Sequence, residues 1–318
     1  MSTSSKARWS GFQYHYQPEK SHVHPFLVDL WKTVELQTDG LVQIEVCANN
    51  GGLKHSHLEI VQDLIEGKIQ FYALMGSILG PIAPVMNIQS LPFIFGTNDD
   101  VYDAMDGEIG EYLKQELIPH GIYLFPHGLM ENGFRHIVCS DKPIYKASDL
   151  AGVSIRIPEG KVFEDTFKSL GANPVPLFVL ELYDALKTGK VTAQENPLAI
   201  LDSLKLYEVT TYVSKTAHMW SGFNLIGNLP FWQSMPRDIQ EIIQSNMTHY
   251  VAKQRQYTIA LNAQLEQDLI SKGMIFNQAD TQTFRACLKG DFYSGWKQQL
   301  GPQLWSLLEQ RFGKLVSD

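Results

Sequence analysis

Short strand-like segments alternate with helical patterns along this chain, and this alternation constrains the fold more than any other feature. In the first half, 41–46 alternates its side chains as a strand does, and 57–66 repeats apolar residues at helical spacing. Gly67 ends that helix before the strand-like segment 69–73. A strand, a helix and a second strand in this order predict a β-α-β unit with parallel strands in one sheet.

The same order recurs in the second half of the chain. The pattern predicts a strand at 152–157 and a helix at 162–170, followed by a helix at 180–187 and a strand at 190–193. Gly residues stand at the ends of these helices, as is typical of helix stops. The chain has 318 residues, which is enough for two domains of ordinary size. We therefore expect two α/β domains with parallel sheets.

One segment predicts a helix too long for a single small domain. Ser234-Met-Pro236 is typical of a helix start, and no Gly or Pro follows until Gly273. At 1.5 Å per residue, such a helix is on the order of 50 Å long. We expect it to span both domains, with the chain crossing between them at the turn-rich segments 131–133 and 217–222. These crossings are candidate hinges.

Composition and charge exclude several classes of function. The chain has 26 Lys and Arg against 34 Asp and Glu, a net charge of −8, and it has no basic run. This balance argues against nucleic acid as a partner. The longest apolar stretch, 73–88, contains two prolines and is too short to span a membrane. Three widely spaced cysteines predict neither a disulfide framework nor a redox pair.

Motif searches give no support for catalysis, for a metal site or for a cofactor. The phosphate-binding loop, the dinucleotide-binding glycine triplet, the G-x-S-x-G elbow and H-E-x-x-H are all absent. Paired histidines occur in 22–24 and 55–57, but no acidic or thiol partner stands at ligand spacing. For the first pair we favour a helix start, with Ser21 as the N-cap and Pro25 in the first turn.

One arginine is placed where an α/β sheet binds its ligands. In 152–158 the apolar residues Val153, Ile155 and Ile157 take one face of the strand, which turns Arg156 to the other face near the carboxyl end. Open α/β sheets bind ligands beyond those ends, and a guanidinium there can hold a carboxylate through two parallel hydrogen bonds. The alternative is a surface ion pair.

Two further polar residues are candidates to bind the same ligand. Asn196 comes directly after the predicted strand 190–193, where its amide can both donate and accept, although an ordinary Asn-Pro turn is the alternative. Arg135 lies at the expected crossing between the domains and supplies a second cation.

These residues belong to a series of motifs that resembles a known family. The series resembles the core of solute-binding proteins of tripartite ATP-independent periplasmic (TRAP) transporters, dicarboxylate-binding type. Its central elements are Arg156-Ile-Pro158, Leu170-Gly-Ala-Asn-Pro-Val-Pro176, Glu181-Leu-Tyr-Asp-Ala-Leu186, Thr188-Gly189 and Gln194-Glu-Asn-Pro197. The similarity continues through 67–69, 91–93, 106–107, 133–135 and the long helix after Ser234, so it covers essentially the whole chain.

The resemblance implies an α/β, two-lobed periplasmic-binding-protein-like fold that closes on a small organic acid and delivers it to a TRAP membrane permease. The expected lobes are 1–133 with about 221–255, and 134–220 with about 256–318. The resemblance further implies a monomer without a cofactor, located in the periplasm. The competing hypotheses are a two-lobed enzyme that acts on a small carboxylate and a cytosolic sensor.

The resemblance also assigns residues to the ligand. Arg156 matches the arginine that pairs with the carboxylate, Asn196 matches the asparagine that hydrogen-bonds the ligand, and Arg135 matches a second arginine near it. Other expected ligand-binding residues are Met75, Phe178, Glu195, His218 and Trp220. Ordinary core packing is the alternative for the apolar members, and the choice between an aromatic and an aliphatic acid stays open.

The N-terminal segment lacks the secretory signal that an exported protein carries when it is synthesised. Residues Met1–Ser10 are polar and lack the apolar core of a secretory signal. We therefore expect that a signal preceded this chain and was removed.

Overall fold

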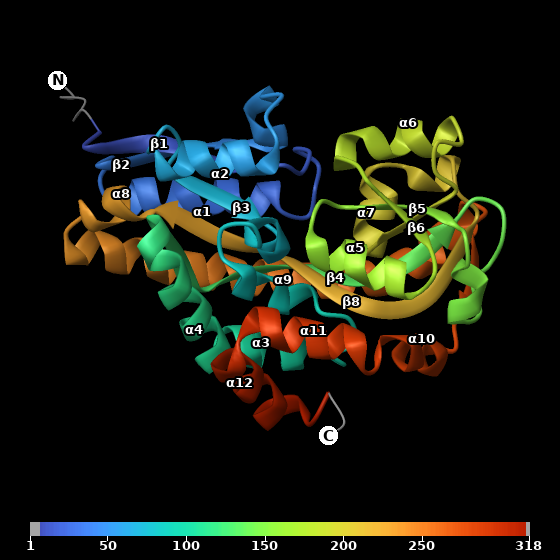
Figure 1. Ribbon diagram of the computed structural model, residues 1–318. Coiled ribbons are helices and arrows are strands. Elements are labelled where there is room, and N and C mark those ends of the chain that lie inside the picture. The colour runs from blue at the N-terminus through green and yellow to red at the C-terminus, as the bar shows by residue number, and fades with distance from the viewer. Residues whose placement is uncertain (1–6, 316–318) are drawn as a thin grey trace. The chain divides into compact units, whose positions relative to one another are not determined.

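The computed structural model describes residues 7–315, which form two compact units (Figure 1). Unit 1 contains the residues up to Met75 together with Tyr102–Glu131 and Gly222–Thr258. Unit 2 contains Gly76–Val101, Asn132–Ser221 and the residues from Ile259 onward. Residues 1–6 of the polar N-terminal segment Met1–Ser10 lie outside the described residues.

Three long elements carry the chain from one unit into the other. They are strand β4 (Ile122–Cys139), strand β8 (Tyr212–Asn228) and helix α9 (Arg237–Ser271). The 35 residues of α9 confirm the predicted long helix. The turns expected at 131–133 and 217–222 are wrong, because both segments lie inside extended strands.

The sheet of unit 1 contains the predicted first β-α-β unit. Strand β1 (Trp9–His15) pairs in parallel with β2 (Val42–Cys47) on one side and with β3 (Phe71–Leu74) on the other. Strand β3 also pairs with the end of β8 in the antiparallel sense. The helices are α1 (His24–Gln37), α2 (His57–Ile65), α4 (Glu108–Leu117), α8 (Leu229–Gln233), the second half of α3 (Asn98–Met105) and the first part of α9.

Local chemistry explains where α2 begins. The Ser56 hydroxyl accepts a hydrogen bond from the Glu59 backbone N–H at 3.3 Å, and the Glu59 carboxylate accepts one from the Ser56 N–H at 2.7 Å. This reciprocal capping box satisfies two backbone donors of the first turn. Of the residues at the predicted apolar spacing, Val61 and Leu64 are completely buried but Leu58 is exposed, and Ile60 is buried as well.

Unit 2 contains the second β-α-β arrangement. Its strands follow the order β8, β4, β7 (Ala193–Asn196), β5 (Ser154–Ile157) and β6 (Asn173–Pro176), and β9 (Ile275–Gln278) pairs with β8. Its helices are α5 (Lys161–Ser169), α6 (Leu182–Lys187), α7 (Leu198–Ser203), α10 (Thr281–Leu288), α11 (Asp291–Leu300) and α12 (Pro302–Phe312), with the last part of α9.

The purely parallel sheets expected from the sequence are wrong. Strand β5 pairs in parallel with β6 and β7, but β4 pairs with β7 in the antiparallel sense. The antiparallel pairs of both units involve β4 and β8, the two strands that pass between the units. Parallel β-α-β units therefore lie beside antiparallel connecting strands in mixed sheets.

The segment 76–101 belongs to unit 2, although the expected division placed it in the first lobe. The Phe93 backbone N–H donates to the His218 carbonyl at 2.8 Å, and the Tyr293 hydroxyl donates to the Pro92 carbonyl at the same distance. The Arg285 guanidinium lies 4.6 Å from the centre of the Phe93 ring. These contacts with distant parts of the sequence hold the segment in unit 2.

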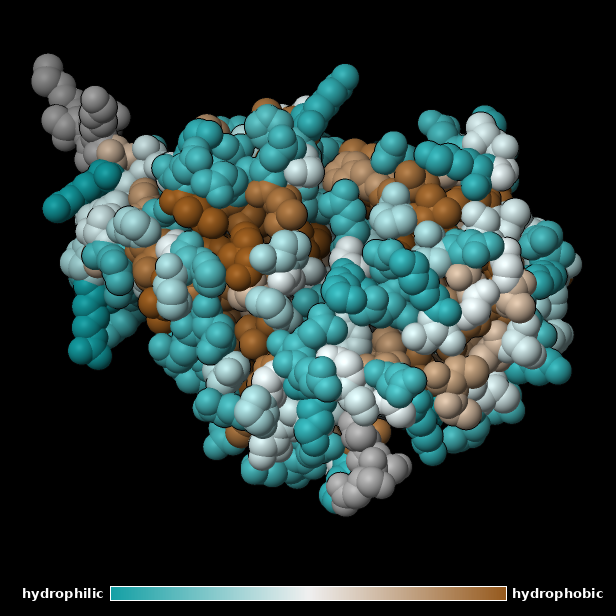
Figure 2. Space-filling view, viewed as in Figure 1, coloured by the Kyte–Doolittle hydropathy of each residue, from teal (hydrophilic) through white to brown (hydrophobic). Residues whose placement is uncertain are grey.

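Polar side chains cover most of the face shown in Figure 2, with apolar side chains visible between them. Within residues 7–315, no helix is both long enough and apolar enough to cross a membrane.

Candidate functional site

A buried ion pair in unit 2 joins two of the residues that the sequence predicts to bind ligand, Arg135 and Glu195. Arg135 extends from β4 and Glu195 from β7, and both side chains are almost completely buried. The Arg135 Nε donates to Glu195 Oε2 at 2.5 Å, and its Nη2 donates to Glu195 Oε1 at 2.7 Å. This fork-to-carboxylate geometry is the strong form of the ion pair. The charge of Arg135 is therefore matched inside the protein.

His218 contacts the same carboxylate from β8. Its Nε2 lies 3.2 Å from Glu195 Oε2, and its Nδ1 lies 2.8 Å from the Thr216 hydroxyl. Burial lowers the pKa of His218, and the hydrogen bond to Glu195 offsets only part of that effect. At neutral pH we assign a neutral ring that donates from Nε2 to Glu195 and accepts from Thr216.

Glu195 stays ionised in this environment. Burial alone raises its pKa, but the charge of Arg135 and the hydrogen bonds from His218 and Arg135 lower the pKa below its usual value. The three side chains thus form one buried network in which Glu195 carries the negative charge and Arg135 the positive charge.

Asn196 is held by its neighbours in the same network. Its Oδ1 accepts from Arg135 Nη2 at 3.1 Å, and its Nδ2 donates to Gln194 Oε1 at 2.5 Å. Gln194 and Asn196 both lie within β7, which starts three residues later than the strand predicted at 190–193. The polar residues of this motif are therefore part of the sheet, and not of a turn that follows it.

Arg156 lies on the neighbouring strand β5, opposite Gln194 in the register. Its side chain is buried, with 2% of the residue exposed. The Leu177 carbonyl oxygen accepts from Arg156 Nε at 2.9 Å and from Nη2 at 2.6 Å, which fixes the plane of the guanidinium. The predicted strand is confirmed, but both of its faces are largely buried.

The remaining residues predicted to bind ligand are Phe178, Trp220 and Met75. Phe178 directly follows Leu177 and is half-buried at the start of the 3-10 turn η6 (Val179–Glu181). Trp220 is buried in β8, two residues beyond His218. Met75 is buried directly after β3 in unit 1, so it belongs to a different unit from the other predicted residues.

Sequence reasoning missed several members of the network. The Ser221 hydroxyl accepts from Arg135 Nη1 at 3.3 Å and from Asn132 Nδ2 at 3.1 Å. The Phe163 ring lies 5.3 Å from the Arg135 guanidinium carbon. Thr216 stands two residues before His218 on one strand, and this spacing places both side chains on the same face. That spacing is the one sequence signal for these residues.

Gly133 fits its position beside this network for a steric reason. Its φ is +130°, and a Cβ there would lie 2.8 Å from Asn262 Nδ2 and 3.0 Å from the Pro197 Cβ. The Asn262 amide donates to the Asn132 carbonyl at 3.0 Å. A side chain at Gly133 would therefore displace the group that holds β4 against α9.

The paired histidines have structural contacts. The Ser21 hydroxyl accepts from the His24 N–H at 3.3 Å, although the N-cap position itself is Val23, so the predicted helix start is off by two residues. His24 Nδ1 lies 2.9 Å from His15 Nε2. Within residues 7–315, no group of three His, Cys, Asp or Glu side chains is arranged to hold a metal ion.

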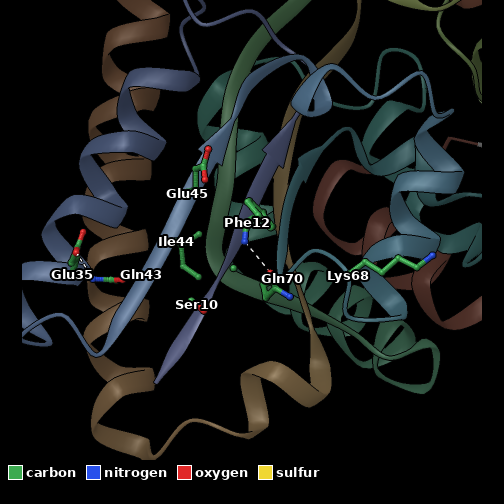
Figure 3. Close-up of a pocket in the computed structure, with 9 residues that line it drawn as sticks. Ser10, Phe12, Glu35, Gln43, Ile44, Glu45, Lys68 and Gln70 are labelled. Carbon is green, nitrogen blue, oxygen red and sulfur yellow. Dashed lines mark hydrogen bonds between the residues drawn. The ribbon is translucent and has the colours of Figure 1, made fainter. Parts of the chain in front are cut away.

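Unit 1 has an open hollow of about 590 Å³ on its sheet (Figure 3). Gln70 Oε1 accepts from the Phe12 N–H at 2.9 Å, and Gly11 leaves room for this side chain because a Cβ would lie 1.9 Å from Oε1. None of the residues predicted to bind ligand lines the hollow. Its lining residues are Ser10, Gly11, Phe12, Glu35, Gln43, Ile44, Glu45, Lys68 and Gln70.

Comparisons with known proteins find similarity over nearly the whole chain. Residues 14–297 match the family model described as bacterial extracellular solute-binding protein, family 7. A solute-binding protein of Roseobacter denitrificans is 27% identical over 296 residues, which cover 93% of this chain and 90% of that protein.

Two solved TRAP periplasmic solute-binding proteins share the fold. The protein from Chromohalobacter salexigens, with bound D-glucuronate, is 25% identical with a TM-score of 0.88, covering 95% of this chain and 98% of that one. The protein from Polaromonas sp. JS666, bound to D-erythronate, is 25% identical with a TM-score of 0.87, covering 94% and 98%. These likenesses confirm the predicted fold class.

Proposed function

The chain belongs to the bacterial extracellular solute-binding proteins of family 7, and we propose that it captures a small organic acid through Arg156 for delivery to a TRAP membrane permease. The orientation of Arg156 is the observation that carries this proposal. The Leu177 carbonyl holds one edge of the guanidinium, which has five N–H donors in a fixed plane. A guanidinium oriented in this way is suited to bind a carboxylate through two parallel hydrogen bonds.

In this proposal the other polar residues of unit 2 position the ligand-binding groups. Asn196 contributes its amide to the ligand. Arg135, which is paired with Glu195, and Gln194 hold that amide in place. The hydrogen bond from Arg135 to Asn196 supports this role, as does the match between the charges of Arg135 and Glu195. Phe178, Trp220, His218 and Met75 remain proposed contacts to the uncharged part of the ligand.

We propose a sugar acid as the ligand class. The two relatives named above hold D-glucuronate and D-erythronate, each with one carboxylate and several hydroxyl groups. Buried polar side chains in unit 2 are compatible with such a ligand, since Gln194 and Asn196 both carry amides that can donate and accept hydrogen bonds. C4-dicarboxylates are the second candidates, because a Rhodobacter capsulatus relative that is 30% identical over 67% of this chain is named for binding them.

We further propose that the protein binds its ligand without chemical turnover, as a monomer in the periplasm. The family consists of solute-binding proteins rather than enzymes, and its description as extracellular supports the location. The alternative, a two-lobed enzyme, predicts that the acid is consumed. Incubating the protein with the acid and recovering it unchanged by mass spectrometry distinguishes these functions.

A thermal-shift screen tests the proposed function. The probes are D-glucuronate, D-erythronate and succinate, with neutral D-glucose as the matched control that lacks a carboxylate. A ligand present at 100 times its Kd stabilises a protein by about 2.7 kcal/mol. We expect at least one acid to raise the Tm by several degrees, while D-glucose leaves it unchanged. A protein stripped by dialysis that responds to none of the acids contradicts the proposal.

A further inference from the structure

Arg135 fixes which atom of the Asn196 amide faces which neighbour. A guanidinium has only donors, and Arg135 Nη2 lies 3.1 Å from the Asn196 side chain, so the atom that faces it is the acceptor Oδ1. The Glu195 carboxylate holds the Arg135 guanidinium through Nε and Nη2. Exchanging the oxygen and nitrogen of Asn196 would therefore set a donor against a donor. The Nδ2 of Asn196 is directed at Gln194 instead.

The same argument fixes the amide of Gln194. The Asn196 Nδ2 donor lies 2.5 Å from Gln194, so the Gln194 atom that faces it is the acceptor Oε1. Nε2 takes the other position of that amide, directed away from Asn196. Gln194 is completely buried, and its Nε2 has no hydrogen-bond partner in the part of the chain that the structure describes, 7–315. Buried donors normally have an acceptor, because leaving one unpaired costs free energy.

Gln194 and Arg156 are neighbours on one face of the sheet in unit 2. Strands β7 and β5 pair in parallel, with Gln194 directly opposite Arg156. Neighbouring strands lie about 4.8 Å apart, and side chains opposite each other in parallel strands point to the same face. The Gln194 amide and the Arg156 guanidinium therefore place donors side by side. An ionised carboxylate matches such a pair, because both of its oxygens accept and neither donates.

We propose that Gln194 is a further ligand-binding residue, whose Nε2 donates a hydrogen bond to the carboxylate that Arg156 holds. Gln194 then selects an ionised carboxylate over a carboxamide of the same shape. A carboxamide has one oxygen, which Arg156 uses, and its nitrogen is a donor that would face Nε2. This inference rests on the proposed function, which supplies the acid.

Titration calorimetry on the full chain tests this role with two pairs of probes. They are D-glucuronate with D-glucuronamide, and succinate with succinamide, and the pair used is the one whose acid binds the wild-type protein more tightly. The weakly bound amide is measured by competition with the acid. The key variant is Gln194→Met, which keeps the length of the side chain and removes its amide. Gln298→Met, at an exposed position on α11 of the same unit, is the matched control.

We expect Gln194→Met to weaken binding of the acid about 10- to 100-fold, as is typical when a buried donor to a charged group is removed. Its effect on the amide should be less than about threefold, so the preference for the acid falls. The same loss should appear when Gln194→Met is made in an Asn196→Ala background, where Gln194 cannot act by holding Asn196. Gln298→Met should leave both affinities unchanged.

A second measurement uses the wild-type protein and does not depend on the folding of a variant. The side-chain amide signals of Gln194, assigned by triple-resonance NMR, should shift when the acid saturates the protein. The side-chain signals of Gln298 should stay in place. Unchanged Gln194 signals at saturation overturn the inference.

The outcomes separate this inference from the proposed function. If the wild-type protein binds an acid and Gln194→Met binds it equally well, the inference is overturned and the proposed function stands. The same conclusion holds if the loss disappears in the Asn196→Ala background, because Gln194 then acts only through Asn196. If neither acid binds the wild-type protein, the proposed function fails and this inference fails with it.

Discussion

The Gln254 side chain on α9 pairs with the backbone of Glu131 on β4 as a neighbouring strand would. Gln254 Oε1 accepts from the Glu131 N–H at 2.8 Å, and Gln254 Nε2 donates to the Glu131 carbonyl at 2.7 Å. Gln254 is completely buried, and its Nε2 also lies 3.1 Å from the His22 carbonyl. One amide thus satisfies both polar groups of the last residue of β4 in unit 1.

Replacing Gln254 with leucine should destabilise the protein by about 2 to 4 kcal/mol, because two buried backbone groups of Glu131 lose their partners. The measurement is urea unfolding followed by circular dichroism. Gln256→Leu is the control, since Gln256 is exposed on the same helix. Equal unfolding midpoints for the two variants would show that the amide contributes nothing to stability.

Replacing Glu195 with glutamine should cost about 3 to 5 kcal/mol, because it leaves the buried Arg135 without its carboxylate. Thermal and urea unfolding measure the loss. Glu241→Gln serves as the control: Glu241 pairs with Arg237 at 2.8 Å on the surface, where side-chain exposures of 66% and 91% make the pair worth under about 1 kcal/mol. The assignment of Glu195 as the counterion fails if both variants are equally stable.

Acid should destabilise the protein through His15. Burial, with the neighbouring His24, lowers the pKa of His15 to about 3. An unfolded histidine has a pKa near about 6.5, so the unfolded state binds this proton first as the pH falls. The stabilisation is complete above that pH and is lost between about pH 6.5 and 3, at a slope of up to about 1.4 kcal/mol per pH unit.

The His15→Gln variant tests this dependence. Its free energy of unfolding should fall less steeply than that of the wild type between about pH 6 and 4, as measured by urea unfolding at each pH. His120→Gln, at an exposed position, is the control. A slope unchanged from the wild type would contradict the assignment of His15 as a group that titrates on unfolding.

The elements that the sequence predicts well are those defined by local patterns. Helix α9 follows from a long run without Gly or Pro, and α2 follows from apolar spacing that ends at Gly67. The strand that carries Arg156 also follows from its alternation. Each of these signals lies within the element itself, so no knowledge of distant contacts is needed.

The elements that the sequence misses depend on distant partners. The polar run 194–196 is typical of a loop, yet it forms β7 because Arg135, about 60 residues earlier, neutralises Glu195 inside the sheet. The segment 131–133 is typical of a turn, yet it lies in β4, where Gln254 and Asn262 of α9 hold its backbone.

Titration calorimetry with Arg156→Lys tests the central claim most directly. The ligand is the acid that gives the largest shift in the thermal screen, and Arg237→Lys on the surface is the control. A lysine keeps the charge but cannot form two parallel hydrogen bonds to one carboxylate. We predict that Arg156→Lys binds the acid at least about 10-fold more weakly than the wild type, while Arg237→Lys binds it equally well. A folded Arg156→Lys protein with wild-type affinity would contradict the claim that Arg156 holds the carboxylate.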